Sequence, residues 1–193
     1  LSDVMQTLRA VKSRDGGRDE ALDALRSVPG VYVPRSYHVV YDEHSWVTER
    51  RPLDGAPAVI PKRRAEMLKG FVTKSVVYTR NSDFGAMHLV EVTRGCGWRC
   101  RFCAEGYTYL PPRTYDADAI LATLPNGVGP RKVGLVGTSL PEHPRLLELL
   151  RGAALDQRTV CTASLRLDGA NREVLTRMTE GAQKTLTIAP EAG

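Results

Sequence analysis

The chain has 193 residues, a formal net charge of +5 and a pI of about 9.2, with 42% hydrophobic and 25% charged residues. This composition is ordinary for a globular chain with a full core, and four cysteines are too few for a disulfide-dense secreted scaffold. No run of about 18 apolar residues occurs, so the sequence predicts no membrane-spanning helix. The net positive charge leaves nucleic acid open as a partner, with charge as the only argument for it.

Residues 1–30 have apolar side chains at helical spacing, which predicts two short helices separated by the sequence RDGG at 14–17. Prolines interrupt the following segment, so we expect loops with short strands at 37–43 and 74–80. We interpret residues 1–85 as an N-terminal helical and irregular linker region.

The remainder, residues 86–193, alternates short β-branched segments with amphipathic ones. We predict strands at 86–92, 131–137, 158–166 and 183–190, and helices at 116–125, 141–155 and 171–181. Right-handed crossovers would make these four strands parallel, with the helices outside. Ligand sites in such folds lie beyond the carboxyl ends of the strands.

Directly after the first of these strands, the segment TRGCGWRCRFCAEG (93–106) carries Cys96, Cys100 and Cys103 in a C-x3-C-x2-C pattern. The segment is too polar and too rich in glycine for a buried core, and three thiols make an odd count for disulfides. A structural zinc site needs four ligands, whereas Cys161 lies within an apolar strand and the histidines are scattered. Three thiolates suit an iron–sulfur cluster with one open iron better. The sparse, clustered cysteines also favour a cytoplasmic location.

This pattern, with the aromatic Phe102 before the last cysteine and a strand before the loop, resembles the radical S-adenosylmethionine superfamily. The resemblance implies a 4Fe–4S cluster on the three cysteines and reductive cleavage of S-adenosylmethionine to a 5′-deoxyadenosyl radical that abstracts hydrogen from an unknown substrate. It implies an electron donor of the flavodoxin or ferredoxin type. The fold class it implies is α/β, a partial (β/α) barrel, here truncated after about four parallel strands.

The same resemblance suggests which residues contact the S-adenosylmethionine, while it assigns no catalytic residue. The expected contacts lie beside the cluster and after the second, third and fourth strands: Phe102, Gly137, Thr138, Ser139, Ser164, Arg166 and Glu191. Among them, Arg166 is the candidate for a bidentate grip on the carboxylate of S-adenosylmethionine.

A narrower resemblance rests on SVPGVYVPRSY (27–37), VEVTRGCGWRCRFCAEGYTYLPPR (90–113) and EGAQKTLTIAPEAG (180–193). These segments are similar to an uncharacterised subfamily of radical enzymes with an N-terminal cobalamin-binding domain. That domain's D-x-H-x-x-G segment does not occur in this sequence. We therefore expect the chain to be part of a longer protein, and the resemblance implies cobalamin only for that parent protein. The substrate stays open and RNA is among the options. The alternative is a non-catalytic cysteine-ligated metal module, with zinc or an iron–sulfur cluster, that binds nucleic acid.

Overall fold

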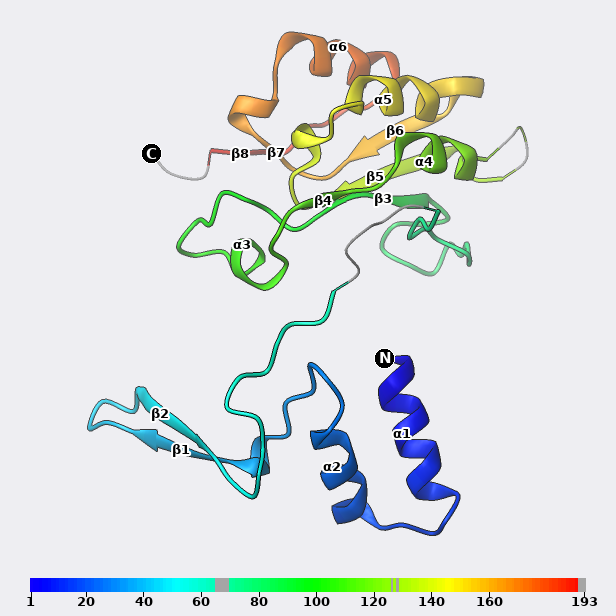
Figure 1. Ribbon diagram of the computed structural model, residues 1–193. Helices are drawn as coiled ribbons and strands as arrows, with labels where there is room; N and C mark the ends of the chain where they lie inside the picture. Colours follow the sequence, from blue (N-terminus) through cyan, green and yellow to red (C-terminus); the bar gives the residue numbers. More distant parts are fainter. Residues whose placement is uncertain (65–69, 126, 128, 191–193) are drawn as a thin grey trace. The chain divides into compact units, whose positions relative to one another are not determined.

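The computed structural model describes residues 1–64, 70–125, 127 and 129–190 (Figure 1). The contacts between residues divide the chain into two compact units, Leu1–Ala65 and Glu66–Gly193. Residues 70–85 thus fall in the second unit, where the backbone around Lys74 runs beside β3 (His88–Arg94), with an isolated bridge from Lys74 to Val90.

In the first unit, two helices and a hairpin follow one another. The elements are α1 (Ser2–Lys12), α2 (Arg18–Arg26), the 3₁₀ helix η1 (Pro34–Ser36), β1 (Tyr37–Tyr41) and β2 (Val47–Pro52). Both predicted helices and the strand at 37–43 are confirmed. Sequence reasoning missed β2 because all of its side chains are exposed, so it has no apolar face that would give a strand-like alternation.

The second unit carries the remaining elements. They are β3, α3 (Glu105–Thr108), β4 (Arg113–Thr114), α4 (Ala117–Thr123), β5 (Lys132–Gly137), η2 (Leu140–Glu142), α5 (Leu146–Ala154), η3 (Leu155–Gln157), β6 (Thr159–Thr162), β7 (Leu165–Arg166), η4 (Leu167–Gly169), α6 (Arg172–Glu180) and β8 (Ile188–Ala189). The helices predicted at 116–125, 141–155 and 171–181 are confirmed, each shorter than predicted.

The core of the second unit lies between a sheet and helices α4, α5 and α6, which lie on one side of it (Figure 1). The sheet order is β4-β3-β5-β6, with β3, β5 and β6 parallel. Strand residues such as Val90, Leu135 and Val160 are buried against Ile120 and Leu149 of the helices. Each fully buried side chain of this size contributes about 1.5–3 kcal/mol to folding.

The predicted partial barrel of four parallel strands is wrong. In the described residues the sheets are small and mixed, and they do not close: β4 joins β3 in antiparallel orientation, and β7 pairs only with β8 in a separate two-stranded sheet. The third predicted strand breaks between β6 and β7, and the fourth is a strand only over β8.

Local hydrogen bonds explain why the fourth strand does not extend the main sheet. The carbonyl of Gly181 accepts from the amide of Val160 in β6 at 2.8 Å, so the end of α6 takes up an edge position. The side-chain amide of Gln183 donates to the carbonyl of Thr185 at 2.9 Å, which occupies an acceptor that a strand ladder would need. These polar contacts replace the pairing expected from the apolar pattern.

Candidate functional site: a cysteine loop and a cavity beside it

The three clustered cysteines lie on residues 95–112, here called the cysteine loop, which leaves the carboxyl end of β3 and returns to β4. The loop closes on itself: the amide of Cys103 donates to the carbonyl of Cys100 at 3.0 Å, and the Tyr107 hydroxyl donates to the carbonyl of Arg99 at 2.9 Å. Because the loop follows the carboxyl end of the parallel strand β3, it lies where ligands of parallel sheets are usually bound.

Glycine is required at two points of the cysteine loop. Gly95 has φ +82°, and a Cβ there would lie 2.2 Å from the carbonyl oxygen of Tyr109. A Cβ on Gly106 would lie 2.8 Å from the Cα of Arg99. Both glycines permit backbone segments to touch, which keeps the loop compact.

Cys96, Cys100 and Cys103 are all partly buried, and no disulfide involves them or Cys161 in β6. Within the part of the chain that the structure describes, no three histidine, cysteine or acidic side chains are gathered closely enough to hold a metal ion together. The donor set itself fits an iron–sulfur cluster in its chemistry, since cysteine thiolates are the usual ligands of such clusters.

A cavity of about 250 Å³, here called the Trp98 cavity, lies beside the cysteine loop. Its lining comes from the cysteine loop, from η2 and its approach, and from the β7–α6 segment: Trp98, Ser139, Pro141, Glu142, Arg166, Asp168, Gly169, Asn171 and Val174. Two of the predicted cofactor contacts, Ser139 and Arg166, thus face one cavity.

Trp98 forms the contacts between the cysteine loop and the other cavity walls. Its indole N–H donates to Glu142 Oε1 of η2. The guanidinium carbon of Arg166 lies 3.7 Å from the centroid of its ring, a close cation–π contact. Arg166 also donates to both carboxylate oxygens of Asp168, at 3.1 and 2.6 Å. One aromatic ring therefore joins three segments that are far apart in the sequence.

Ser139 contributes a buried polar atom to the cavity. The residue is only 3% exposed, and its hydroxyl oxygen has no hydrogen-bond partner among the described residues. Its amide points to the hydroxyl of Thr93, at 3.4 Å. Gly137 fits this packing because a Cβ there would lie 2.2 Å from the same Thr93 hydroxyl. A buried hydroxyl without a partner is costly, so Ser139 is available to a ligand.

Of the other residues expected to contact the cofactor, those that the structure describes lie outside the cavity lining. Thr138 is exposed and its hydroxyl reaches Glu105 Oε2 of α3 at 3.4 Å. Phe102 is 73% exposed. Ser164 is exposed in the break between β6 and β7, so it does not lie on one continuous strand with Arg166. Glu191 lies outside the described residues.

A second polar network fixes the end of β3. Arg94 donates to both carboxylate oxygens of Glu91, at 2.7 and 2.5 Å, and the hydroxyl of the buried Tyr115 donates to Glu91 at 2.9 Å. Burial alone would raise the pKa of Glu91, but these hydrogen bonds bring that pKa below its usual value. Burial raises the pKa of Tyr115. The charged carboxylate therefore anchors the strand from which the cysteine loop departs.

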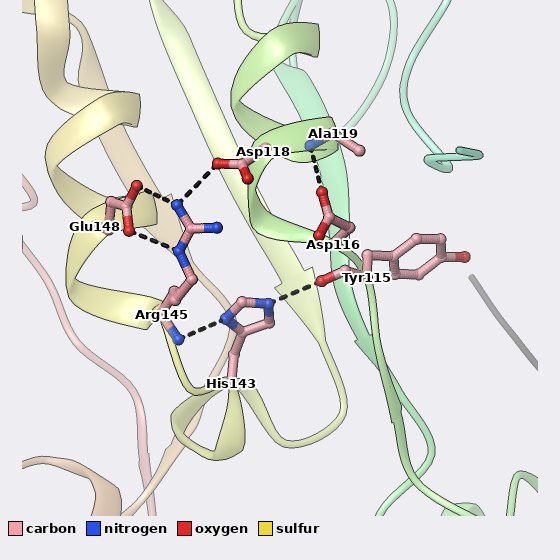
Figure 2. A network of polar contacts seen from close by, with 7 residues as sticks. All are labelled: Tyr115, Asp116, Asp118, Ala119, His143, Arg145 and Glu148. Carbon is pink, nitrogen blue, oxygen red and sulfur yellow. Dashed lines mark hydrogen bonds and ion pairs between the residues drawn. The ribbon is translucent and has the colours of Figure 1, made fainter. Parts of the chain in front are cut away.

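His143 fixes the segment after η2, as Figure 2 shows. The imidazole is 4% exposed and lies between two backbone groups. Its Nδ1 accepts from the amide of Arg145 at 3.1 Å, so Nε2 carries the proton and donates to the carbonyl of Tyr115 at 2.9 Å. The ring thus ties the Glu142 side of the cavity to the segment that follows the cysteine loop.

Around this histidine, Arg145 forms ion pairs with Asp118 of α4 at 2.8 Å and with Glu148 of α5 at 2.5 Å, and the Asp116 side chain caps α4 by accepting from the amide of Ala119 (Figure 2). These partners are exposed, and exposed ion pairs contribute little. The buried imidazole is accordingly the main polar connection in this region.

Sequence reasoning missed Trp98, Glu142, Asp168 and Asn171 as cavity residues. For Trp98 a signal was present, because it stands between two cysteines of the motif. Asp168 follows Arg166 by two residues, a spacing at which an ion pair could have been expected. Glu142 and Asn171 had no local signal, since their places in the lining depend on how the segments pack.

Fold and site together define an α/β chain in which a loop with three cysteines borders a polar and aromatic cavity. No family model matches the chain. It is similar to uncharacterised protein MJ0966 of Methanocaldococcus jannaschii, with 36% identity over 115 residues, which is 57% of this chain and 25% of that protein. The chain thus spans about a quarter of the length of this relative. No described helix is long and apolar enough to cross a membrane.

Proposed function

We propose that the chain is part of a radical S-adenosylmethionine enzyme, in which Cys96, Cys100 and Cys103 hold a 4Fe–4S cluster. The observation that carries the proposal is the C-x3-C-x2-C loop at the carboxyl end of a central parallel strand, in contact through Trp98 with the ends of the neighbouring segments. When bound, the cluster would supply one electron for cleavage of S-adenosylmethionine to methionine and a 5′-deoxyadenosyl radical, which abstracts hydrogen from a substrate.

The chain's own residues would bind and orient the reactants. The partly buried thiols are donors for iron, and Arg99 and Arg101 on the same loop would offset the charge of thiolates and sulfides. Ser139 offers a hydrogen bond that no described residue uses, and Arg166 offers a guanidinium at the cavity wall. An electron donor of the flavodoxin or ferredoxin type is the partner that this function needs, and RNA is among the candidate substrates.

The test is anaerobic reconstitution with iron and sulfide, followed by incubation with S-adenosylmethionine and a reductant. The proposal expects a visible absorbance shoulder, about four irons per chain, as a 4Fe–4S cluster requires, and formation of 5′-deoxyadenosine. Stoichiometric zinc, no iron uptake and no cleavage would overturn it and favour a non-catalytic metal module, for which nucleic-acid binding would then be measured.

We expect Arg166→Ala to keep the full iron content and to weaken S-adenosylmethionine binding about tenfold. Loss of a charge-assisted hydrogen bond costs about 1.5–3 kcal/mol, or roughly ten- to a hundredfold in affinity. The lower end applies because Asp168 already accepts from this guanidinium and a ligand carboxylate must replace it. Calorimetric titration of the reconstituted variant measures the effect.

The matched control for this variant is Arg177→Ala. Like Arg166, Arg177 donates to a carboxylate, but its partner is Glu180 within α6, and both residues lie outside the cavity lining. We expect its affinity for S-adenosylmethionine to match the unsubstituted protein. Equal affinities in both variants would show that Arg166 has no role in binding the cofactor.

A further inference from the structure

Trp98 joins the cysteine loop to the neighbouring segments, and the proposed function gives its side chain no role in metal ligation. It stands two residues after Cys96 and two residues before Cys100, so its backbone belongs to the segment that metal ligation must hold in place. Its side chain is committed to other parts of the fold, with the indole N–H on Glu142 and the ring face against Arg166. Metal binding at the thiols and displacement of Glu142 or Arg166 at the cavity wall would therefore both affect the position of Trp98.

The Trp98 ring is about half exposed, at 51%, and both of its contacts are with charged side chains. A hydrogen bond to a charged acceptor is stronger than one between neutral groups. The Arg166 guanidinium is held over the ring by its own pairing with Asp168, which limits its freedom to leave. The position of Trp98, and with it the loop between Cys96 and Cys100, is thus coupled to side chains of η2 and β7.

We propose that Trp98 is a positioning residue that couples metal ligation in the cysteine loop to the Trp98 cavity. The inference rests on the proposed function only in requiring that the three thiols bind a metal. By thermodynamic linkage, if ligation fixes Trp98, then Glu142 and Arg166 must influence the affinity of the thiols for metal, although both belong to other elements. The cavity would in turn respond when the thiols are occupied.

The experiment measures Zn²⁺ affinity by competition with a chromophoric chelator, since Zn²⁺ binds thiolates and needs no sulfide or reductant. We expect Glu142→Gln and Arg166→Gln each to change the affinity by about fivefold or more, the lower bound of typical coupling between sites. The matched control, Glu148→Gln, removes a carboxylate from an exposed ion pair outside the cavity lining and should stay within about twofold.

A double-mutant cycle then assigns the coupling to the ring. In a Trp98→Ala background, Glu142→Gln and Arg166→Gln should no longer alter Zn²⁺ affinity, because the residue through which they act is gone. Trp98→Phe, which keeps an aromatic face but lacks the N–H, should restore the effect of Arg166→Gln and not that of Glu142→Gln. If Glu142→Gln and Arg166→Gln still alter Zn²⁺ affinity in the Trp98→Ala background, the proposal is overturned. Such effects would arise from direct electrostatic interaction of these charges with the metal site and not through the ring.

An optical measurement provides an independent check. The chain has two tryptophans, so in Trp46→Phe the tryptophan emission comes from Trp98 alone. Zn²⁺ is a d¹⁰ ion without absorption in the near ultraviolet, where tryptophan is excited and emits. Its binding should alter acrylamide quenching of Trp98 in this variant, and the quenching should stay unaltered when Cys100→Ala is added. Unaltered quenching at saturating Zn²⁺ would overturn the inference, while failure of iron uptake with these Zn²⁺ effects intact would overturn only the proposed function.

Discussion

Each of the single substitutions Cys96→Ala, Cys100→Ala and Cys103→Ala should abolish iron uptake, and with it all cleavage of S-adenosylmethionine. A cubane cluster held by two protein thiolates is poorly retained, so the three residues act as one unit and single losses should be as severe as a triple loss. Iron per chain after anaerobic reconstitution and desalting, together with the visible absorbance, measures this. We expect less than about a tenth of the iron retained by the unsubstituted protein, as for loss of a cluster ligand.

Cys161→Ala is the matched control for these three variants. Cys161 is a partly buried thiol in β6, where its backbone pairs with Gly134 of β5, and it lies outside the cysteine loop. Its removal should leave the iron content unchanged. If Cys161→Ala loses iron while Cys100→Ala retains it, the ligands have been assigned to the wrong thiols.

His143→Ala should lower the free energy of unfolding by about 2–4 kcal/mol. The change leaves the amide of Arg145 and the carbonyl of Tyr115 without their partner in a buried place, and each buried polar group without a hydrogen bond costs about 1–3 kcal/mol. Denaturant unfolding of the full chain, followed by circular dichroism, measures the difference.

The comparison for this variant is His44→Ala, because His44 is exposed in the β1–β2 hairpin and its side chain contacts only the neighbouring Glu43 carboxylate among the contacts described. A surface change of this kind should stay within about 0.5 kcal/mol. A loss below about 1 kcal/mol in His143→Ala would mean that the two backbone groups find other partners, and that the imidazole does not hold the segment in place.

The cysteine loop is a part of the structure that could be predicted from the local sequence. Three thiols within one short glycine-containing loop after an apolar strand could be recognised without coordinates, and the strand, the loop and the following helix lie where they were predicted. Helices α1, α2, α4, α5 and α6 could also be predicted, because their apolar residues recur at a spacing that depends only on neighbours along the chain. The chemistry of the metal ligands stays a proposal carried by this motif.

The pairing of strands depended on contacts that local patterns do not contain. The apolar character of residues 183–190 suggested a fourth parallel strand, but the carbonyl of Gly181 and the side chain of Gln183 form other hydrogen bonds there. The short edge strand β4 had no sequence signal, since two residues are too few to show alternation. Tertiary hydrogen bonding therefore overrode the strand propensity of this segment.

The sequence by itself determined the local helices and the spacing of the three cysteines, and it indicated candidates for the chemistry, among them the arginines beside the cysteines, Ser139 and Arg166. Only the tertiary structure decided which of these face one another. It placed Ser139 and Arg166 in one cavity, left Phe102 and Ser164 outside its lining, and brought Glu142 and Arg166 onto the ring of Trp98. The reason is physical: residue type and spacing set local conformation, whereas a cavity is formed by segments distant in sequence, whose contacts depend on the packing of the whole unit.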